Sequence, residues 1–581
     1  MDRRFLYAVL LAIGVLLITP KLFPPVPPPV TSADTAATVR GDSAKGAAPA
    51  AGAVVDGAKG VAGATGAAPA AGPAAGPAVA PAPAPVRVDT TTIVTPRVTW
   101  RFSSAGGALI GASLADFMVL PAHERHVELA RAGVPLVSYR LLHGGDTVDL
   151  ARVAFTADTA PAQTVAYHAA LPAAAVALRY TFVADSYLVR VQGTVRGADT
   201  TPMRVVIAMP MGLASSEADT LDDHRSLAYV WKPPMDEAQS EPFSTIVKKG
   251  PIARAGPFEW VASKSKYFLL AVIAPDKPEF SGPVLFSSRL TPPRDPEAAK
   301  RAPAPPKVPA EATAELVVTP DAQGRFAFEV YAGPQQWRRL VALGHGLQDA
   351  NPYGGFARGL IQPISRWVVA ILLWMHDTFG ISYGWVLIIF GVGVRLILWP
   401  LNQSAMRSSL RMQRIQPELQ ALQAKHKGSP EKMQAEYMKL LESHGMTPFS
   451  QFSGCLPMLI PMPVLFALFF VFRNTIEFRG VPFWWMSDLS LKDPYYILPI
   501  VMGLSMFLLS WVGLRNAPPN PQAKMMGYMM PGMMVVLFLG FPAGLNLYYG
   551  VQNLAALPQQ WMIAQERAKQ APPRPAVPQK K

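Results

Sequence analysis

Five apolar stretches follow one another between residues 382 and 563, with very few Asp, Glu or Lys residues inside them. Each is about long enough for a helix to cross the ~30 Å hydrocarbon core of a bilayer. The whole chain is 50% hydrophobic and 16% charged, whereas soluble proteins carry about 25% charged residues. We therefore predict transmembrane helices near residues 382–400, 457–473, 495–513, 526–541 and 544–563.

Arg395 interrupts the first of these stretches, which is otherwise apolar from Gly384 to Leu401. A guanidinium inside a bilayer is costly, with estimates from roughly 2.5 to above 10 kcal/mol, and it usually faces a bundle interior or a wet cavity. The alternative is that its long side chain snorkels toward polar Asn402, about 10 Å away at ~1.5 Å per helical residue. This segment by itself leaves both interpretations open.

Charge and motif content argue against several other classes of function. The net charge of +14 is better explained by basic residues that flank the apolar spans than by nucleic-acid binding. Cys455 is the only cysteine, which excludes an intrachain disulfide and a multi-thiolate metal site. The pair His123 and His126 is more typical of a solvated loop than of a metal site. We expect no cofactor, no metal and no covalent catalysis.

The first 20 residues predict a transmembrane signal anchor. Arg3 and Arg4 precede an apolar run from Phe5 to Ile18, as in a signal peptide. No small-residue cleavage site follows, so an uncleaved anchor is favoured over a cleaved signal peptide. Residues 21–91 are rich in Ala, Pro and Gly and predict a disordered linker, because they cannot bury enough apolar surface to offset the entropy of ordering.

Residues 92–345 predict a β-sandwich. Apolar and polar residues alternate with a period of two on both sides of a turn at Ala184 to Ser186, and glycine pairs such as Gly144-Gly145 mark hairpins. A Pro-rich loop, from Thr291 to Pro309, interrupts the pattern.

Residues 350–378 predict an amphipathic helix, which is favoured to lie in the membrane interface. Packing under the β-domain is the alternative. Its apolar face is formed by Phe356, Leu360, Ile364, Trp367, Val368, Ile371 and Met375, and its polar face by Arg358, Gln362 and Arg366.

Residues 402–446 predict a helical hairpin that is basic in its first arm. Pro430 and Glu431 suit the start of the second helix, and Gly445 suits its end. The positive-inside rule places this hairpin and the basic tail 566–581 in the cytoplasm, and the β-domain outside. The basic side chains of the hairpin include Arg407, Arg411, Arg414, Lys425, Lys427, Lys432 and Lys439.

The last apolar stretch carries mildly polar residues. Asn546, Tyr549 and Asn553 are spaced to share one helical face, and Tyr548 and Gln552 lie between them. An interhelix hydrogen-bond seam explains that face equally well. Together with Arg395, these residues favour a wet half-channel, open to the cytoplasm, through which a polypeptide passes into lipid. Burial of the client's apolar surface, at ~25 cal/mol per Å², would drive the step.

Several short motifs run in order through about residues 350–565. They are Val394-Arg395 with Pro400-Leu401, Arg411-Met412 with Gln416-Pro417, Gly454 to Pro457, Met462-Pro463, Asp493 to Pro499 with Met502-Gly503, and Phe541 to Tyr549. Through these motifs the chain resembles the YidC/Oxa/Alb family of membrane insertases. The β-region is similar, more loosely, to the large periplasmic sandwich of Gram-negative members, through Glu259-Trp260-Val261 and Tyr331 to Pro334.

The resemblance implies a multi-domain inner-membrane protein with an α-helical bundle of five core transmembrane helices, an N-terminal anchor and a periplasmic β-sandwich. Its insertase core would be residues 379–565. It implies an insertase for nascent membrane proteins that works alone or with the Sec translocon. The hairpin is implied to receive clients or ribosomes. The groove residues would be Arg395, Tyr548, Tyr549, Met462 and Leu465, and we add Asn546 and Asn553 as polar groups of the last helix.

Two positions depart from the family pattern. Pro461 stands where many relatives have glutamine, so the helix should be kinked there and contribute less polarity. Leu465 stands where relatives have a client-contacting aromatic residue. A channel or solute transporter is the alternative function, although neither pore-lining ionisable residues nor inverted repeats are evident. A membrane-anchored enzyme would require convergent carboxylates or histidines, which the sequence does not place.

Overall fold

The computed structural model describes a β-rich domain followed by a helical region. Nothing of the predicted anchor 1–20 lies inside the described residues, and of the linker 21–91 only the last residues do. The described residues are 88–158, 163–199, 201–275, 279–288, 311–351, 358–400, 402, 403, 415, 418, 421, 422, 425, 426, 430–444, 462–515 and 521–570.

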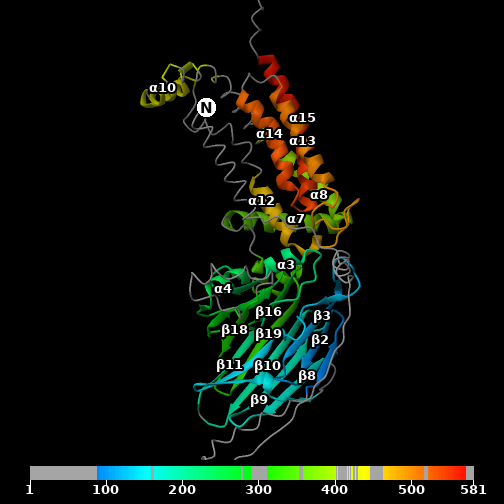
Figure 1. Ribbon diagram of the computed structural model, residues 1–581, viewed down its shortest axis with the longest axis vertical. Coiled ribbons are helices and arrows are strands. Elements are labelled where there is room, and N and C mark those ends of the chain that lie inside the picture. Colours follow the sequence, from blue (N-terminus) through cyan, green and yellow to red (C-terminus); the bar gives the residue numbers. More distant parts are fainter. Residues whose placement is uncertain are drawn as a thin grey trace, which may run out of the picture. The chain divides into compact units, whose positions relative to one another are not determined.

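The described part of the β-rich domain contains three antiparallel sheets (Figure 1). The four-stranded sheet has the order β1 (Thr90–Val94), β2 (Val98–Ser103), β3 (Leu109–Met118), β4 (His126–Glu128). The nine-stranded sheet has the order β13 (Gln239–Pro242), β12 (Ala228–Lys232), β15 (Trp260–Lys264), β16 (Phe268–Ile273), β19 (Arg325–Pro334), β10 (Leu188–Gly197), β9 (Ala174–Phe182), β8 (Thr164–Ala170), β7 (Thr156–Asp158). The six-stranded sheet has the order β14 (Ile252–Arg254), β17 (Val284–Ser287), β18 (Thr313–Val318), β11 (Met203–Met209), β5 (Ser138–His143), β6 (Asp146–Asp149).

Short helices connect several of these strands. They are η1 (Leu150–Arg152), α3 (Thr220–Ser226), α4 (Phe243–Lys249), α6 (Trp337–Leu343) and η2 (Leu347–Ala350).

The alternation in the sequence places the core of this domain as predicted. Along β9, buried and more exposed residues alternate, so that Tyr180 and Phe182 face inward. The Tyr180 hydroxyl lies 2.9 Å from that of Tyr139 on β5, which joins the nine-stranded and six-stranded sheets across the core. The ring centroid of Phe102 on β2 lies 4.6 Å from that of Tyr180, so the four-stranded sheet also packs against this core. The prediction of a β-rich domain is confirmed.

The helical region has a helix at each of the five predicted apolar stretches. These are α8 (Tyr383–Ile397), α12 (Met462–Asn474), α13 (Ile497–Leu514), α14 (Pro521–Phe538) and α15 (Ala543–Gln570). The other helices described there are α7 (Arg358–Phe379), α10 (Pro430–Ser443) and η5 (Ile476–Phe478). Helix α13 packs against α14 and α15, α15 against α8, and α12 against α7. Among the described helices, α13 alone is long and apolar enough to cross a membrane by itself, and α7 and α8 meet that criterion only as a pair bent by 119°.

Helix α7 presents its side chains differently from the prediction. Val368 and Met375 are buried in the helical core, whereas Trp367 is 73% exposed, so the expected single apolar face is divided in two. The predicted polar face does not face solvent either, because Gln362 is 3% exposed and bonds to Arg358. These polar groups reach residues just before α7 and in the β-domain, through Arg366 to Asp349 and Arg358 to Ala238. The polar groups of α7 therefore form hydrogen bonds with other residues of the protein, whereas apolar side chains such as Trp367 are exposed.

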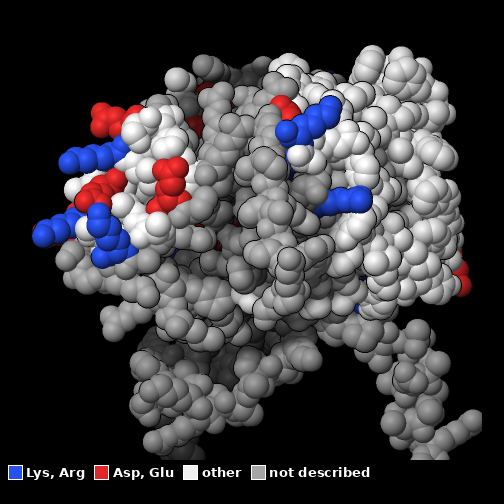
Figure 2. Space-filling model, turned by 90° about the horizontal axis from the view of Figure 1, so that it is seen from above, with Lys and Arg blue, Asp and Glu red and all other residues white. Residues whose placement is uncertain are grey.

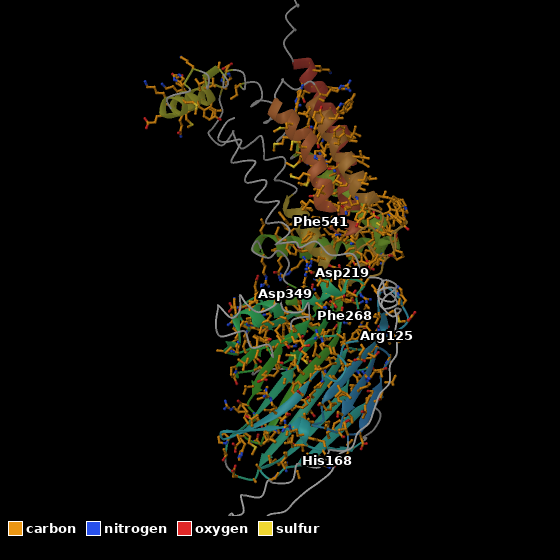
Figure 3. The ribbon with its side chains drawn as sticks, viewed as in Figure 1. Arg125, His168, Asp219, Phe268, Asp349 and Phe541 are labelled. Carbon is orange, nitrogen blue, oxygen red and sulfur yellow. The ribbon has the colours of Figure 1, made fainter. Side chains whose placement is uncertain are left out.

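A buried ion pair joins the β-rich domain to the loop after α12. The Arg479 Nε lies 2.8 and 2.9 Å from the two carboxylate oxygens of Glu217, and both side chains are 6% exposed. The same guanidinium donates to the carbonyls of Met118 and Ser216 and lies over the ring of Phe268. Figure 3 labels Phe268 and Asp219 in this part of the β-domain. The Nε and Nη2 groups of Arg479 thus both donate to the β-rich domain.

A second, partly buried carboxylate reinforces the same junction. Asp222 accepts from Arg473 at the end of α12 (2.8 Å) and from Lys266 of the β-domain (3.0 Å). Burial raises the pKa of Asp222, but the charges of Lys266 and Arg473 outweigh burial, and the net pKa is lowered. Asp222 therefore stays ionised between its two cations.

Glu477 lies in η5 at this junction with fewer partners. It accepts a hydrogen bond from the backbone N–H of Trp337 (3.1 Å), and its Oε2 has no hydrogen-bond partner among the described residues. Burial raises the pKa of Glu477 from 4.5 to about 7. The ionised carboxylate is therefore poorly accommodated in the folded protein.

We expect Glu477→Gln to stabilise the protein at pH 8 and to change its stability little at pH 4. Because the folded state binds this proton more tightly than the unfolded chain, stability falls as the pH rises from about 4.5 to about 7 and then levels off. Glutamine stays neutral and still accepts from Trp337, so the gain above pH 7 should be on the order of 1–3 kcal/mol. Thermal unfolding in detergent at the two pH values measures this, and equal shifts at both would contradict it.

Candidate functional site

Arg395 lies in the last turn of α8 and contacts α15. Its Nη2 donates to Oε1 of Gln559 (2.9 Å), whereas its Nε has no hydrogen-bond partner among the described residues. The Gln559 side chain is 1% exposed and donates in turn to the Trp399 carbonyl (3.0 Å) and Gln403 Oε1 (3.3 Å). Within the described residues no carboxylate lies at ion-pair distance from Arg395. Its positive charge is therefore held by neutral oxygen atoms and is not cancelled.

A second polar contact lies further along the same two helices. Gln552 donates to the hydroxyl of Tyr548 (2.9 Å) and to the Gly391 carbonyl of α8 (3.0 Å). Tyr548, Gln552 and Gln559 are four and seven residues apart, so they lie near one side of α15. Polar groups thus follow the α8–α15 contact through a region that is otherwise apolar.

Tyr548 takes part in the polar contacts between α8 and α15, whereas Asn546 and Asn553 form hydrogen bonds elsewhere. Asn546 is buried and donates to the carbonyls of Phe538 and Phe541 at the end of α14. Asn553 donates to Ser505 on α13 (3.2 Å). These contacts are the interhelix hydrogen bonds that the sequence left as the alternative, although the Asn546 Oδ1 has no hydrogen-bond partner among the described residues. A role for these residues in binding a polypeptide stays a prediction.

The remaining predicted groove residues lie elsewhere in the helical core. The ring of Tyr549 packs against Phe538 on α14, 5.3 Å between centroids. Leu465 on α12 is half-buried and packs against the helical core. Met462 begins α12, but its side chain and Pro461 lie outside the described residues, as does the kink predicted there.

The predicted basic hairpin is described mainly through its second helix. Arg407, Arg411 and Arg414 lie outside the described residues, and Lys425 is exposed. Helix α10 begins at Pro430 as predicted, and Lys432 is exposed in its first turn. Acidic and basic side chains are mixed on α10, as Figure 2 shows, so the second arm is not basic.

The sequence did not single out Gln559, which is the hydrogen-bond partner of Arg395. Its distance of seven residues from Gln552 places both on one side of α15, and that spacing is the signal that could have found it. The polar residues identified in the sequence ended at Asn553, about 1.7 helical turns before Gln559.

Two family models match adjacent parts of the chain. The one described as "YidC periplasmic domain" matches residues 90–367, and the one described as "60Kd inner membrane protein" matches residues 374–570. They meet between the β-rich domain and the helical region, within α7.

Several known proteins are similar to the chain over part of its length. The membrane protein insertase YidC of Anaeromyxobacter sp. (strain K) is 39% identical over 260 residues, which are 44% of this chain and 45% of that relative. The insertase of the same name from Burkholderia ambifaria (strain MC40-6) is 31% identical over 399 residues, or 67% of this chain and 66% of that relative. A crystal structure of an active YidC insertase with its first transmembrane domain resolved has 17% identity and a TM-score of 0.34, and the match covers 82% of this chain and 94% of that one.

Proposed function

The chain belongs to the YidC family of membrane proteins, and we propose that it moves nascent transmembrane segments from the cytoplasm into the bilayer. The observation that carries this proposal is the uncancelled charge of Arg395 between α8 and α15. A positive charge held only by neutral groups can still attract an acidic segment of a client. The relatives reported above are named membrane protein insertases, which favours this use of the charge over a purely structural one.

In the proposed mechanism, polar parts of the client approach Arg395, Gln559 and the Tyr548–Gln552 pair while its apolar segment moves sideways into lipid. Burial of that segment drives the step at ~25 cal/mol per Å², so no nucleotide and no ion gradient are needed. We assign no catalytic residue. The client-contacting roles of Met462, Leu465, Tyr549, Asn546 and Asn553 belong to the same proposal.

The proposed topology places the β-rich domain, residues 92–345, in the periplasm of a bacterium with an inner membrane. The hairpin 402–446 and the tail 566–581 lie in the cytoplasm, and 1–20 is an anchor joined by the linker 21–91. The core 379–565 crosses the membrane with five helices. The segment 350–378 lies in the interface, which the exposed apolar side chains of α7, such as Trp367 and Trp374, support. Partners in this proposal are nascent membrane proteins, the Sec translocon, ribosomes and lipids.

Purified protein in liposomes tests the proposed function against the channel or transporter alternative. A single-span client with an acidic tail should become protected from protease in these liposomes and not in empty ones. Flux of a trapped small solute without client should equal that of empty liposomes. Solute flux without client protection would contradict the insertase proposal.

A further inference from the structure

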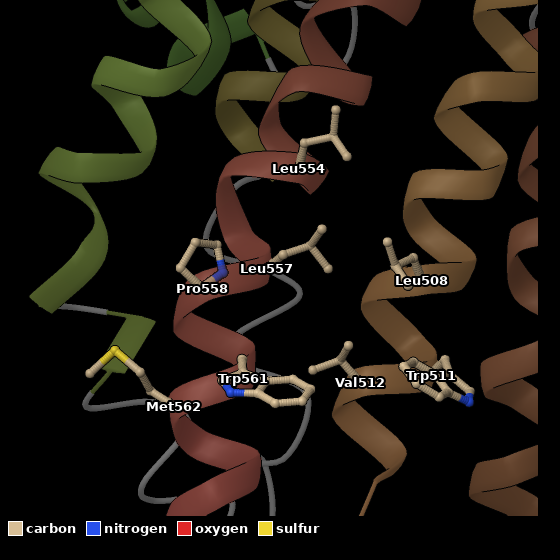
Figure 4. A pocket seen from close by; sticks show the side chains of 8 residues that line it. All are labelled: Leu508, Trp511, Val512, Leu554, Leu557, Pro558, Trp561 and Met562. Carbon is tan, nitrogen blue, oxygen red and sulfur yellow. The ribbon is translucent and has the colours of Figure 1, made fainter.

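An apolar hollow of about 670 Å³ lies between α13 and α15 (Figure 4). Its lining side chains come from α13 and α15 and do not include Arg395 or Gln559. Figure 4 shows Trp511 and Trp561 toward one end of the hollow and Leu554 toward the other. The lining side chains are Leu508, Trp511, Val512, Leu554, Leu557, Pro558, Trp561 and Met562.

A cation lies at the tryptophan end of this hollow. The guanidinium carbon of Arg515, directly after α13, lies 5.5 Å from the ring centroid of Trp511 and 5.2 Å from that of Trp561. Arg515 is exposed and makes no ion pair with a carboxylate of the described residues. The two rings fix the guanidinium at the mouth of the hollow, so it remains available to an anion there.

Other charges near this end are mostly basic. Arg567 of α15 donates to the Gly513 carbonyl of α13, which joins the two helix ends, and Lys569 follows it in the last turn. Glu566 is the acidic residue beside them. The net charge of the helix ends is therefore positive, while the hollow itself is apolar.

The position of this end in the bilayer follows from α13. Its first turn is bonded to Asp493, in the loop that follows the junction with the β-rich domain. An 18-residue helix spans about 27 Å at ~1.5 Å per residue. With α13 crossing the bilayer as proposed above, Arg515 lies about one bilayer core away from that loop, at the depth of lipid headgroups. Tryptophan and arginine at that depth are typical of a membrane interface.

We propose that this hollow binds an anionic phospholipid of the leaflet at this end, cytoplasmic in the topology given above. An acyl chain occupies the space between Leu508 and Leu557, and the phosphate pairs with Arg515. Charge complementarity favours this occupant over a client or partner helix, because an apolar helix would leave the guanidinium at the mouth without an anion. This inference rests on the topology proposed above, which gives the span of α13 and the leaflet.

Native mass spectrometry of the full chain in detergent tests the proposal. The probes are phosphatidylglycerol and phosphatidylcholine with the same acyl chains. The wild-type protein should bind the anionic lipid more tightly than phosphatidylcholine. Arg515→Gln should lower the ratio of the two affinities about five-fold, as expected for one basic side chain at a membrane surface. Leu557→Trp, which fills the hollow, should weaken the binding of both lipids.

Lys524→Gln is the matched control, since Lys524 is an exposed cation in the first turns of the neighbouring helix α14. It should leave the lipid preference unchanged. Equal affinity of the wild-type protein for both lipids would overturn the proposal, as would unchanged preference in Arg515→Gln. Displacement of the lipid by soluble glycerol phosphate would also overturn it, by showing a phosphate site without an acyl-chain site. None of these readouts requires a client, so the outcome is independent of insertion activity.

Discussion

Replacing Arg395 by alanine should lower the insertion of a client with an acidic tail about tenfold, and replacing it by lysine should preserve most of the activity. An attraction between a charge and an acidic group contributes about 1.5–3 kcal/mol where solvent is partly excluded, and 1.4 kcal/mol corresponds to a factor of ten. Alanine also leaves the buried Oε1 of Gln559 without its donor, whereas an ammonium group can still supply both the charge and a hydrogen bond.

The measurement is depletion of the native protein and complementation with each variant, with protease protection of two clients that differ only in the acidity of their tails. With Arg395→Ala, insertion of the neutral-tailed client should fall much less than insertion of the acidic-tailed client. Lys524→Ala removes an exposed cation from α14 and serves as the control. Full insertion of the acidic client by Arg395→Ala would refute the role of the charge, and an equal loss in Lys524→Ala would show a general effect of net charge.

The local pattern of the chain predicted which segments form strands and helices, but not how they pair. Alternation across the Ala184–Ser186 turn predicted β9 and β10, because side-chain direction in a strand depends on local geometry alone. The partner of β10 on its other side is β19, and β16 continues the sheet from there. Alternating strands of similar composition carry no local mark of their neighbour, so sheet order could not be predicted.

The faces of α7 show a related limit. Helical spacing correctly predicted a helix, but it assigned Gln362 to solvent because glutamine is usually exposed. Its burial depends on Arg358 and Asp349, which offer hydrogen bonds that only tertiary structure brings together. At the candidate site, Arg395 was predictable as a charge within an apolar span. Its contact with Gln559 crosses from α8 to α15 and could be predicted only after the two helices were known to be neighbours.

The junction between the β-rich domain and the helical region could not be predicted at all, and it carries the second large effect. Glu217 and Arg479 are 262 residues apart and read as two ordinary surface charges. Arg479→Met should destabilise this junction by about 3–5 kcal/mol, because it leaves the Glu217 carboxylate buried without its cation. The double variant Glu217→Gln with Arg479→Met should recover most of this loss. A remainder of about 1–2 kcal/mol is expected because the carbonyls of Met118 and Ser216 lose the hydrogen bond from Arg479. The Ser216 carbonyl keeps its hydrogen bond from the backbone N–H of Leu120 (2.9 Å).

The loss in Arg479→Met should also depend on pH. Burial raises the pKa of Glu217 even with Arg479 present, against the lowering effect of the Arg479 charge. Removing that charge raises the pKa further, so the folded variant binds a proton that the unfolded chain releases at lower pH. The free energy of unfolding of Arg479→Met therefore falls as the pH rises from the pKa of Glu217 in the unfolded chain to its raised pKa in the folded variant. The destabilisation relative to the wild-type protein should be larger at pH 8 than at pH 5.

Hydrogen exchange of residues 216–223 and 476–481 measures the opening free energy of the junction directly, without requiring the whole membrane protein to unfold in one step. Arg325→Met is the matched control, because Arg325 pairs with Asp321 at the surface, where its side chain is 65% exposed. Surface pairs contribute about 0–1 kcal/mol, so exchange near Arg325 should change little. If Arg479→Met altered exchange no more than this control does, the pair would be a passive contact, and the attachment of the β-rich domain would have to depend on Asp222 and its two cations.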